Sequence, residues 1–313
     1  IYSAINIIGI YGSYIINLFH SRKFISNDKI EYLNLNQHMK PIFTFFALSL
    51  AVSIYTNMDT VMLGFMKGDT EVGYYNLATK IKDVLVSALT ALGTVLLPRL
   101  SFYYSTGKHE ELKKALEKSM HFTALTTIPA VIFFYIISKN AVLFLGGQQY
   151  LPAIGCMQII TIAVLPISFA NIACTQILAP MGRERYTMYS TIIGAIVNLM
   201  VNSLLIPMLG ASGAALGTVI AEVVVAGVQI YYARDYYGKL LKKEVFGKII
   251  VSNFIAMLAL ILFKNINIFY SPILNIIVDF ILYSIVYAVL LLLLKDGIAK
   301  NILGRLLCKM KDK

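Results

Sequence analysis

Hydrophobic runs fill most of the chain and alternate with short polar connections. A helix needs about 20 apolar residues to cross the roughly 30 Å of hydrocarbon in a bilayer. The stretches of that kind cover residues 1–19, 41–66, 72–98, 119–138, 151–179, 186–206, 211–233, 245–263 and 272–294. They lack the strict alternation of barrel strands, and backbone groups in lipid must otherwise bond within a helix. The pattern predicts an all-α polytopic membrane protein with nine transmembrane helices.

The overall composition agrees with this pattern. Of the 313 residues, 58% are hydrophobic and 14% are charged, whereas a typical soluble domain has about 45–50% and about 25%. These values exclude a disordered chain, a disulfide-stapled secreted module and an ordinary soluble enzyme. The three cysteines are far apart, with no CxxC pair, and predict neither a metal site nor a redox couple.

Basic residues gather in alternate connections. All but five of the 27 Lys and Arg residues lie in or beside the connections that follow the first, third, fifth, seventh and ninth predicted helices. The five exceptions are Lys67, Lys80, Lys82, Lys139 and Lys264. Because basic loops stay in the cytoplasm, these connections and the tail 295–313 are predicted to be cytoplasmic. The net charge of +11 then requires no nucleic-acid partner.

A polar stripe follows the third predicted helix. At 100° per residue its six polar positions fall within an arc of about 80°. They are Asn76, Lys80, Asp83, Ser87, Thr90 and Thr94. The opposite side carries Ala78, Leu85, Leu89, Leu92 and Leu96. We expect the stripe either to line a water-filled path or to pack against other helices, and the apolar side to face lipid.

Further ionisable residues lie inside predicted helices, where they are costly and often functional. Asp59 and Lys80 sit at similar depths, about 10–12 Å from the outer ends of their helices, so they could meet. Lys80 and Asp83 could instead neutralise each other, while Lys82 points away from the stripe. Asp59, Asp83 and Glu222 are candidates for a coupling-ion site, although a lone buried carboxylate can also be protonated and inert.

Three smaller features concern the later helices. Asn198 and Asn202 share one face of the sixth predicted helix and join the candidate cavity-lining residues. Pro166 removes a backbone hydrogen bond and should bend the fifth helix. Gly213 and Gly217 should allow close helix packing; they do not form a phosphate loop, because no strand precedes them and no Lys-Ser/Thr follows. No familiar catalytic signature such as HExxH or GxSxG occurs.

Three ordered segments carry a family resemblance. The first is YTNMDTVMLGFMKGDTEVGYYNLATKI with a later LLPRL, matching at Asp59, Leu63, Gly64, Gly73, Tyr74, Tyr75, Lys80, Ile81 and Pro98. The second is LFLGGQQYLPA, matching at Phe144, Gly146, Tyr150 and Ala153. The third is NLMVNSLLIPMLGASGAALGTVIAE, matching at Asn198, Asn202, Pro207, Gly210, Gly213, Ala214, Ala215, Thr218 and Glu222. Together they resemble the bacterial polysaccharide flippases of the multidrug/oligosaccharidyl-lipid/polysaccharide exporter superfamily.

The resemblance implies two six-helix lobes related by pseudo-symmetry, often followed by two more helices. On that plan residues 1–19 are the last helix of the first lobe and residues 41–233 are the second lobe. Residues 245–294 then form the two extra C-terminal helices, and the basic tail follows. The chain begins at Ile1 within an apolar run, so we expect it to be a fragment that lacks most of the first lobe.

The resemblance also implies a transporter, and not an enzyme, in the bacterial plasma membrane. It would flip undecaprenyl-diphosphate-linked oligosaccharide units to the outer leaflet by alternating access, for O-antigen, capsule or exopolysaccharide synthesis. Lys80 would attract the diphosphate, and the Asn, Ser and Thr groups would bond the sugars. The expected partners are the lipid-linked oligosaccharide, membrane lipids, a polysaccharide polymerase and chain-length machinery, with no cofactor, metal or nucleic acid.

Two alternatives stay open at this point. A multidrug cation exporter of the same superfamily would favour an acidic cavity, whereas this stripe mixes lysine with aspartate. A membrane enzyme of polysaccharide assembly could build its site from distant residues, although polymerases of this kind usually carry a large charged outer loop that the sequence lacks.

Overall fold

The computed structural model describes residues 2–21, 39, 56–238, 240, 243–264, 271–301 and 304. The chain divides into two compact units, Ile1–Ser53 and Ile54–Lys313. The first unit contains helix α1 (Tyr2–Ser21), which covers the first predicted span. Of the second predicted span, residues 56–67 are helical, and residues 41–55 lie outside the described part.

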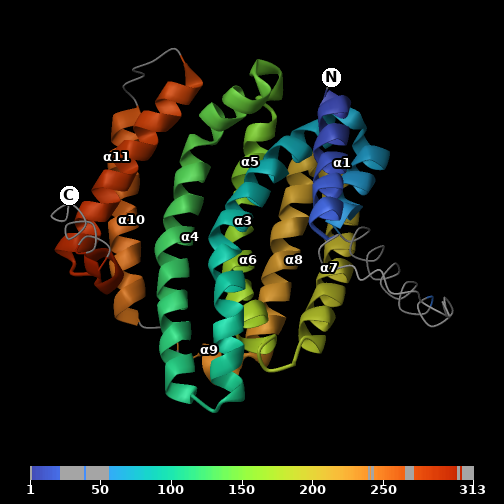
Figure 1. Ribbon diagram of the computed structural model, residues 1–313. Coiled ribbons are helices and arrows are strands. Elements are labelled where there is room, and N and C mark those ends of the chain that lie inside the picture. The colour runs from blue at the N-terminus through green and yellow to red at the C-terminus, as the bar shows by residue number, and fades with distance from the viewer. Residues whose placement is uncertain are drawn as a thin grey trace. The chain divides into compact units, whose positions relative to one another are not determined.

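The second unit is a bundle of long helices (Figure 1). The long helices are α3 (Asp69–Ser105), α4 (His109–Gly146), α7 (Arg185–Leu209), α8 (Ala211–Tyr232), α10 (Lys243–Lys264) and α11 (Pro272–Leu293). Between α4 and α7 the chain forms η1 (Gln148–Tyr150), α5 (Ala153–Ile162), α6 (Val164–Asn171) and the π-helix η2 (Ile172–Leu178). The short α9 (Arg234–Tyr237) follows α8. The described residues contain helices and no strand, which confirms the all-α class.

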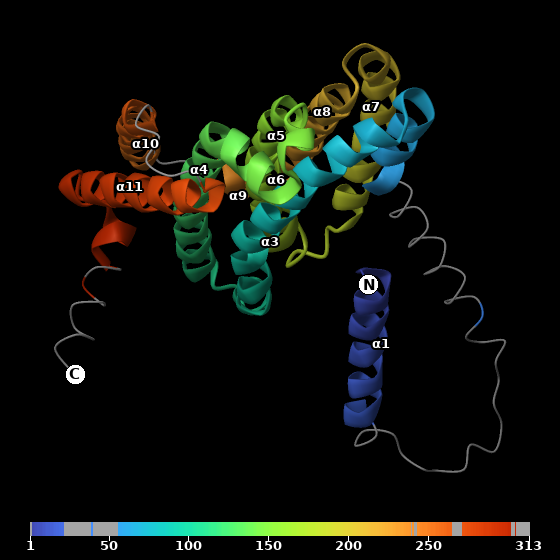
Figure 2. The same cartoon turned by 90° about the horizontal axis from the view of Figure 1, so that it is seen from above.

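Neighbouring helices in the second unit pack in a clear order. α7 lies along α8, α8 contacts α5 and α6, and α3 packs on α4 and α5. α10 and α11 pair with each other and lean on α4, on the side away from α7 and α8 (Figure 2). The last two long helices therefore form an attached pair at the edge of the bundle.

The membrane assignment is supported by helix length and composition. Within the described residues, seven helices are long and apolar enough to cross a bilayer, counting Ala153–Leu178 as one. They correspond to the third through ninth predicted spans. The predicted total of nine is not confirmed, because α1 is not among the seven and the second span is only partly described. The chain is a multi-pass membrane protein.

Helix α4 is longer at both ends than the predicted span 119–138. It runs unbroken from His109 to Gly146, so it also takes in most of the connection before that span and the first part of the connection after it. Hydropathy alone marks where a helix meets lipid, whereas backbone hydrogen bonds continue for further turns into water.

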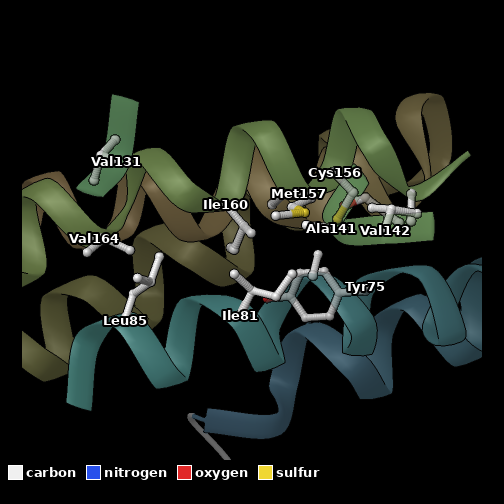
Figure 3. Packing of buried hydrophobic residues seen from close by; sticks show 14 of the residues in the cluster. Tyr75, Ile81, Leu85, Val131, Ala141, Val142, Cys156, Met157, Ile160 and Val164 are labelled. Carbon is white, nitrogen blue, oxygen red and sulfur yellow. The ribbon is translucent and has the colours of Figure 1, made fainter. Parts of the chain in front are cut away.

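The apolar side of α3 faces the protein core, so the expectation that it faces lipid is wrong for its first half. Ala78 and Leu85 are buried there, and Leu89 packs against the same cluster. Figure 3 shows Leu85 near Val164 of α6 and Ile81 near Ile160 of α5. The polar stripe is therefore the outward face of α3 in this bundle. Because lipid cannot solvate such a face, it requires water or further protein beside it.

The fifth predicted helix is broken near Pro166, as expected. α5 ends at Ile162, where the Ala163 amide bonds to Ile160 at 3.1 Å in a tighter turn, and α6 begins at Val164. Pro166 has no amide hydrogen to give to the Ile162 carbonyl, which explains the break. The same span ends in a π-helical turn with the Ala179 amide bonded to Cys174. Such turns also bend a helix.

Glycines bring α7 and α8 into close contact, as the sequence predicts. A Cβ on Gly213 would meet the backbone carbonyl of Leu205 on α7, and one on Gly217 would overlap the Asn202 amide. Between membrane helices such close approach matters because lipid provides no hydrophobic drive for association. Van der Waals contact and interhelical hydrogen bonds hold the pair instead.

We expect Gly213→Ala to destabilise the purified protein by about 1–3 kcal/mol, because the new methyl group meets rigid backbone on α7 and α7 must move away. Its matched control is Gly227→Ala on the same helix, where an added Cβ meets nothing within 4 Å. That control should be neutral or slightly stabilising. Thermal unfolding in detergent measures both, and equal midpoints for the two variants would contradict the close-packing account.

Candidate functional site

The carboxylate of Asp59 is the centre of a buried hydrogen-bond network. Tyr75 of α3 donates to its Oδ2 at 2.5 Å, and Thr218 of α8 donates to the same atom at 2.9 Å. Asn202 of α7 donates to Oδ1 at 2.5 Å and also to Asn198 at 3.1 Å. The network joins the helix at 56–67 to α3, α7 and α8. It therefore fixes the relative positions of four helices through one charged group.

A polar cavity of about 570 Å³ opens beside this network. Its walls come from the helix at 56–67, from residues 75–83 of α3, and from α7 and α8. The lining residues that carry charge are Asp59, Lys80, Lys82, Asp83 and Glu222. A volume of this order is typical of ligand pockets. The structure thus brings together most of the charged residues that the sequence places at membrane depth.

The two lysines of the cavity differ in their partners. Lys82 pairs with Asp83 at 3.0 Å, so the alternative in which Lys80 neutralises Asp83 is wrong. Lys82 was expected to point away from the stripe, yet it lines the cavity together with stripe residues. Lys80 is exposed on the stripe and forms no ion pair with any described residue, including Asp59. Lys80 is therefore the lysine whose charge is left for a ligand.

The remaining stripe residues continue beyond the cavity along α3. Asn76 lines the cavity, whereas Ser87, Thr90 and Thr94 do not. The Thr90 hydroxyl donates to the Val86 carbonyl at 2.7 Å, and Thr94 bonds its own helix in the same way. These hydroxyls can still accept hydrogen bonds through their lone pairs. They form an open polar track that leads from the cavity toward the other end of α3.

The donor set does not match a multivalent metal site. The described residues contain no group of three His, Cys, Asp or Glu side chains close enough to hold a metal ion. Asp59 brings one carboxylate, surrounded by hydroxyl and amide groups. That environment suits a proton or a monovalent cation better than zinc, which prefers imidazole and thiolate ligands.

Sequence reasoning missed several of these residues as site members. Tyr75 and Thr218 were noted only as matching motif positions, although each contacts Asp59 directly. Tyr75, Thr79 and Lys82 lie on the side of α3 next to the stripe, where the helix at 56–67 and α8 close the cavity. A helical wheel of α3 alone does not show which neighbouring helix packs against each of its sides. The sequence signal that marked Tyr75 and Thr218 was their place in the family motifs.

Comparisons with known proteins agree with this architecture. The MatE family model matches residues 45–204, just over half of the chain. The Lipid II flippase MurJ of Bacillus subtilis is 25% identical over 229 residues, covering 68% of this chain and 40% of MurJ. The Putative O-antigen transporter of Shigella dysenteriae is 27% identical over 228 residues, covering 70% of this chain and 54% of that protein. The Probable flippase AglR of Haloferax volcanii is 22% identical, covering 69% of this chain and 44% of AglR.

A solved structure shares the fold. The structure titled Lipid II flippase MurJ, inward closed conformation, matches with a TM-score of 0.72 and 16% identity, over 88% of this chain and 59% of that one. This chain thus spans about half or less of the length of the three curated relatives described above. All three of those relatives are named as flippases or transporters. With its ordered motifs, its helical bundle and a family match over more than half of its length, the chain belongs to the MatE family of the multidrug/oligosaccharidyl-lipid/polysaccharide exporter superfamily.

Proposed function

We propose that the chain forms part of a membrane transporter that carries the headgroup of a lipid-linked oligosaccharide across the bilayer. The observation that carries this proposal is the outward polar face of α3, which extends the Asp59 cavity along a helix of membrane-spanning length. Diphosphate and sugar groups cannot cross hydrocarbon, because they would lose their hydrogen bonds. A continuous face of amide, hydroxyl and ammonium groups replaces those bonds. The flippase names of the relatives support this substrate class.

In this proposal a second group of helices must face the polar side of α3, so that the path between them is enclosed. Residues 41–233 would form the second of two lobes, residues 1–19 the last helix of the first, and residues 245–294 an attached pair. Rocking of the two lobes would open the cavity to each side in turn, as in other transporters built from repeats. The outward direction of the α3 stripe supports this arrangement, because that face would be unstable against lipid.

Orientation follows from charge in the same proposal. The basic ends of α3, α4 and α8 and the tail 295–313 would be cytoplasmic, since positively charged loops stay on that side. The C-terminus would then be inside, and the Asp59 cavity would lie toward the outer half of the membrane.

Asp59 is our candidate for the coupling-ion or proton site. Asp83 is a weaker candidate because its side chain is 66% exposed and already paired with Lys82. Glu222 lines the same cavity and is the second choice. Asp59 differs from both because its charge state controls hydrogen bonds to three other helices. A change of its charge would therefore alter helix packing, which is what coupling requires.

Export of cationic drugs is the competing function in this superfamily. The cavity holds three carboxylates, which favours a cation, but also two lysines, which oppose it. A drug-susceptibility assay separates the two functions. Protection of cells against cationic drugs, without any effect on surface polysaccharide, would favour the drug exporter.

Cysteine labelling tests the water-filled path directly. In a background where Cys156, Cys174 and Cys308 are replaced by Ala, single cysteines at 76, 83, 87 and 94 should react with a membrane-impermeant thiol reagent. They should react because thiolates form only where water reaches the side chain. The measurement is the labelled fraction in intact membranes.

The matched controls are Val84→Cys and Val95→Cys on another side of α3. Their side chains are 69% and 74% exposed, so the bundle itself does not cover them. We expect them to stay unlabelled because lipid covers them. If all four stripe positions were sealed in every transport state, or if the valine positions reacted equally well, the proposed path would not exist.

A further inference from the structure

A second cavity, of about 640 Å³, lies at the basic end of the bundle. α3 contributes Leu92, Leu96 and Arg99 to its wall, and α4 contributes Lys114, Lys118 and Phe122. The segment 298–301 closes another side. Asp296 holds that segment in place, because it accepts the amides of Ile298 and Ala299 at 3.0 Å and the His121 ring at 2.7 Å. These hydrogen bonds tie the start of that segment to α4.

Three cations and one carboxylate line this cavity. Arg99, Lys114 and Lys118 form no ion pair with any described residue, and Glu111 is the one carboxylate in the lining. The Arg99 Nε donates to the Tyr103 hydroxyl at 2.7 Å, which orients the guanidinium while its other donors remain available. Lys114 and Lys118 are one turn apart and share a face of α4. The charged side chains of the lining therefore carry a net positive charge, which favours an anion.

A buried serine hydroxyl in the wall of this cavity indicates a hydrogen-bond partner that is not among the described residues. Ser119 lines the cavity and is 2% exposed, yet its Oγ has no hydrogen-bond partner among the described residues. Leaving a buried hydroxyl unpaired is unfavourable, so such groups are nearly always bonded to something. A phosphate oxygen can accept from it.

The remaining lining is apolar, which argues against a free inorganic anion as the natural occupant. Leu92, Leu96 and Phe122 offer a surface for an acyl chain next to the three cations. At 100° per residue, the arc of α3 that carries Leu92, Leu96 and Arg99 lies nearly opposite the polar stripe. The cavity is therefore on the far side of α3 from the proposed transport path, and the transported headgroup is not its natural occupant.

We propose that this cavity binds the phosphate headgroup of an anionic phospholipid from the membrane leaflet at the basic end. Arg99, Lys114 and Lys118 hold the phosphate, and Ser119 donates a hydrogen bond to it. One acyl chain lies along the leucines of α3. Binding here joins α3, α4 and the segment 298–301, and it does not depend on the transport function proposed above.

Native mass spectrometry of the purified 313-residue chain in detergent tests the proposal. Short-chain phosphatidylglycerol should bind, and phosphatidylcholine should bind at least about tenfold more weakly, because its headgroup carries no net charge. The double variant Arg99→Gln/Lys118→Gln should weaken phosphatidylglycerol binding about tenfold, and Ser119→Ala about threefold. Ser119→Ala removes no hydrogen bond within the described protein, so it should test the site with little effect on the fold.

The matched control is Lys113→Gln/Arg183→Gln, which removes the same charge from exposed residues at the same end but outside the cavity. It should bind phosphatidylglycerol like the unchanged protein. Equal loss in the control would show a diffuse charge effect and overturn the proposal. So would equal binding of both lipids, or displacement of the lipid by inorganic phosphate at comparable concentration.

Discussion

Lys80→Ala should reduce transport by about tenfold or more while leaving the fold intact, because in the proposed function it removes the cation that would contact the anionic headgroup. Lys80 is exposed in the cavity and pairs with no described acid, so removing it breaks no ion pair with the described residues. The measurement is the appearance of polysaccharide at the surface of cells whose export depends on the protein. Helix content and the thermal unfolding midpoint of the purified variant should stay unchanged.

Lys82 and Lys139 provide graded controls for this prediction. Lys82→Ala removes a lysine of the same cavity whose charge Asp83 already balances, so its effect on transport should be smaller. Lys139→Ala removes an exposed lysine of α4 outside the cavity and should have no effect. Lys80→Arg keeps the charge and should retain most of the transport. Full transport by Lys80→Ala would remove this residue from the site.

Asp59→Ala should both destabilise the bundle and abolish transport. It leaves Tyr75, Asn202 and Thr218 without their common acceptor in a buried place. Interhelical hydrogen bonds in membranes contribute up to about 1.7 kcal/mol each, so losing several of them should cost about 2 kcal/mol or more. Thermal unfolding in detergent and surface polysaccharide in cells measure the two effects.

The control for Asp59 is Asp69→Asn, in the exposed first turn of α3. It should cost less than about 1 kcal/mol, the range of a helix-dipole contact. A double-mutant cycle with Asn202→Ala sharpens the test, because residues that share a hydrogen bond give non-additive losses. Additive losses from Asp59→Ala and Asn202→Ala would show that the network does not act as a unit.

The fold class and most helix positions were predictable because a membrane restricts what a chain can do. Long apolar runs must form helices in lipid, so α7, α8, α10 and α11 fall within a few residues of their predicted bounds. The ends of α4 were mispredicted because helix geometry continues into water without a hydropathy signal. Pro166 could be recognised as a break because its missing donor acts locally.

The charged residues show the limit of such local reasoning. Depth along a helix and position on its wheel placed Asp59 and Lys80 near each other, and both line one cavity. The same reasoning left open a pair between Lys80 and Asp83, whereas Lys82 is the lysine that pairs with that carboxylate. A lysine side chain is long enough to reach several acidic residues, so the residue it pairs with depends on which helices pack beside it. The partners of Asp59 lie 16 to 159 residues away along the chain, and no local pattern reports such contacts.

The sequence by itself determined that this is a helical membrane protein with a polar stripe, buried charges and the motifs of one transporter superfamily. It did so because apolar length, helical period and charge asymmetry act locally along the chain. Only the tertiary structure decided that the apolar side of α3 faces the core, that Lys82 neutralises Asp83, and that a carboxylate joins four helices. Those outcomes depend on which surfaces meet, and that is settled by the packing of segments distant in the chain.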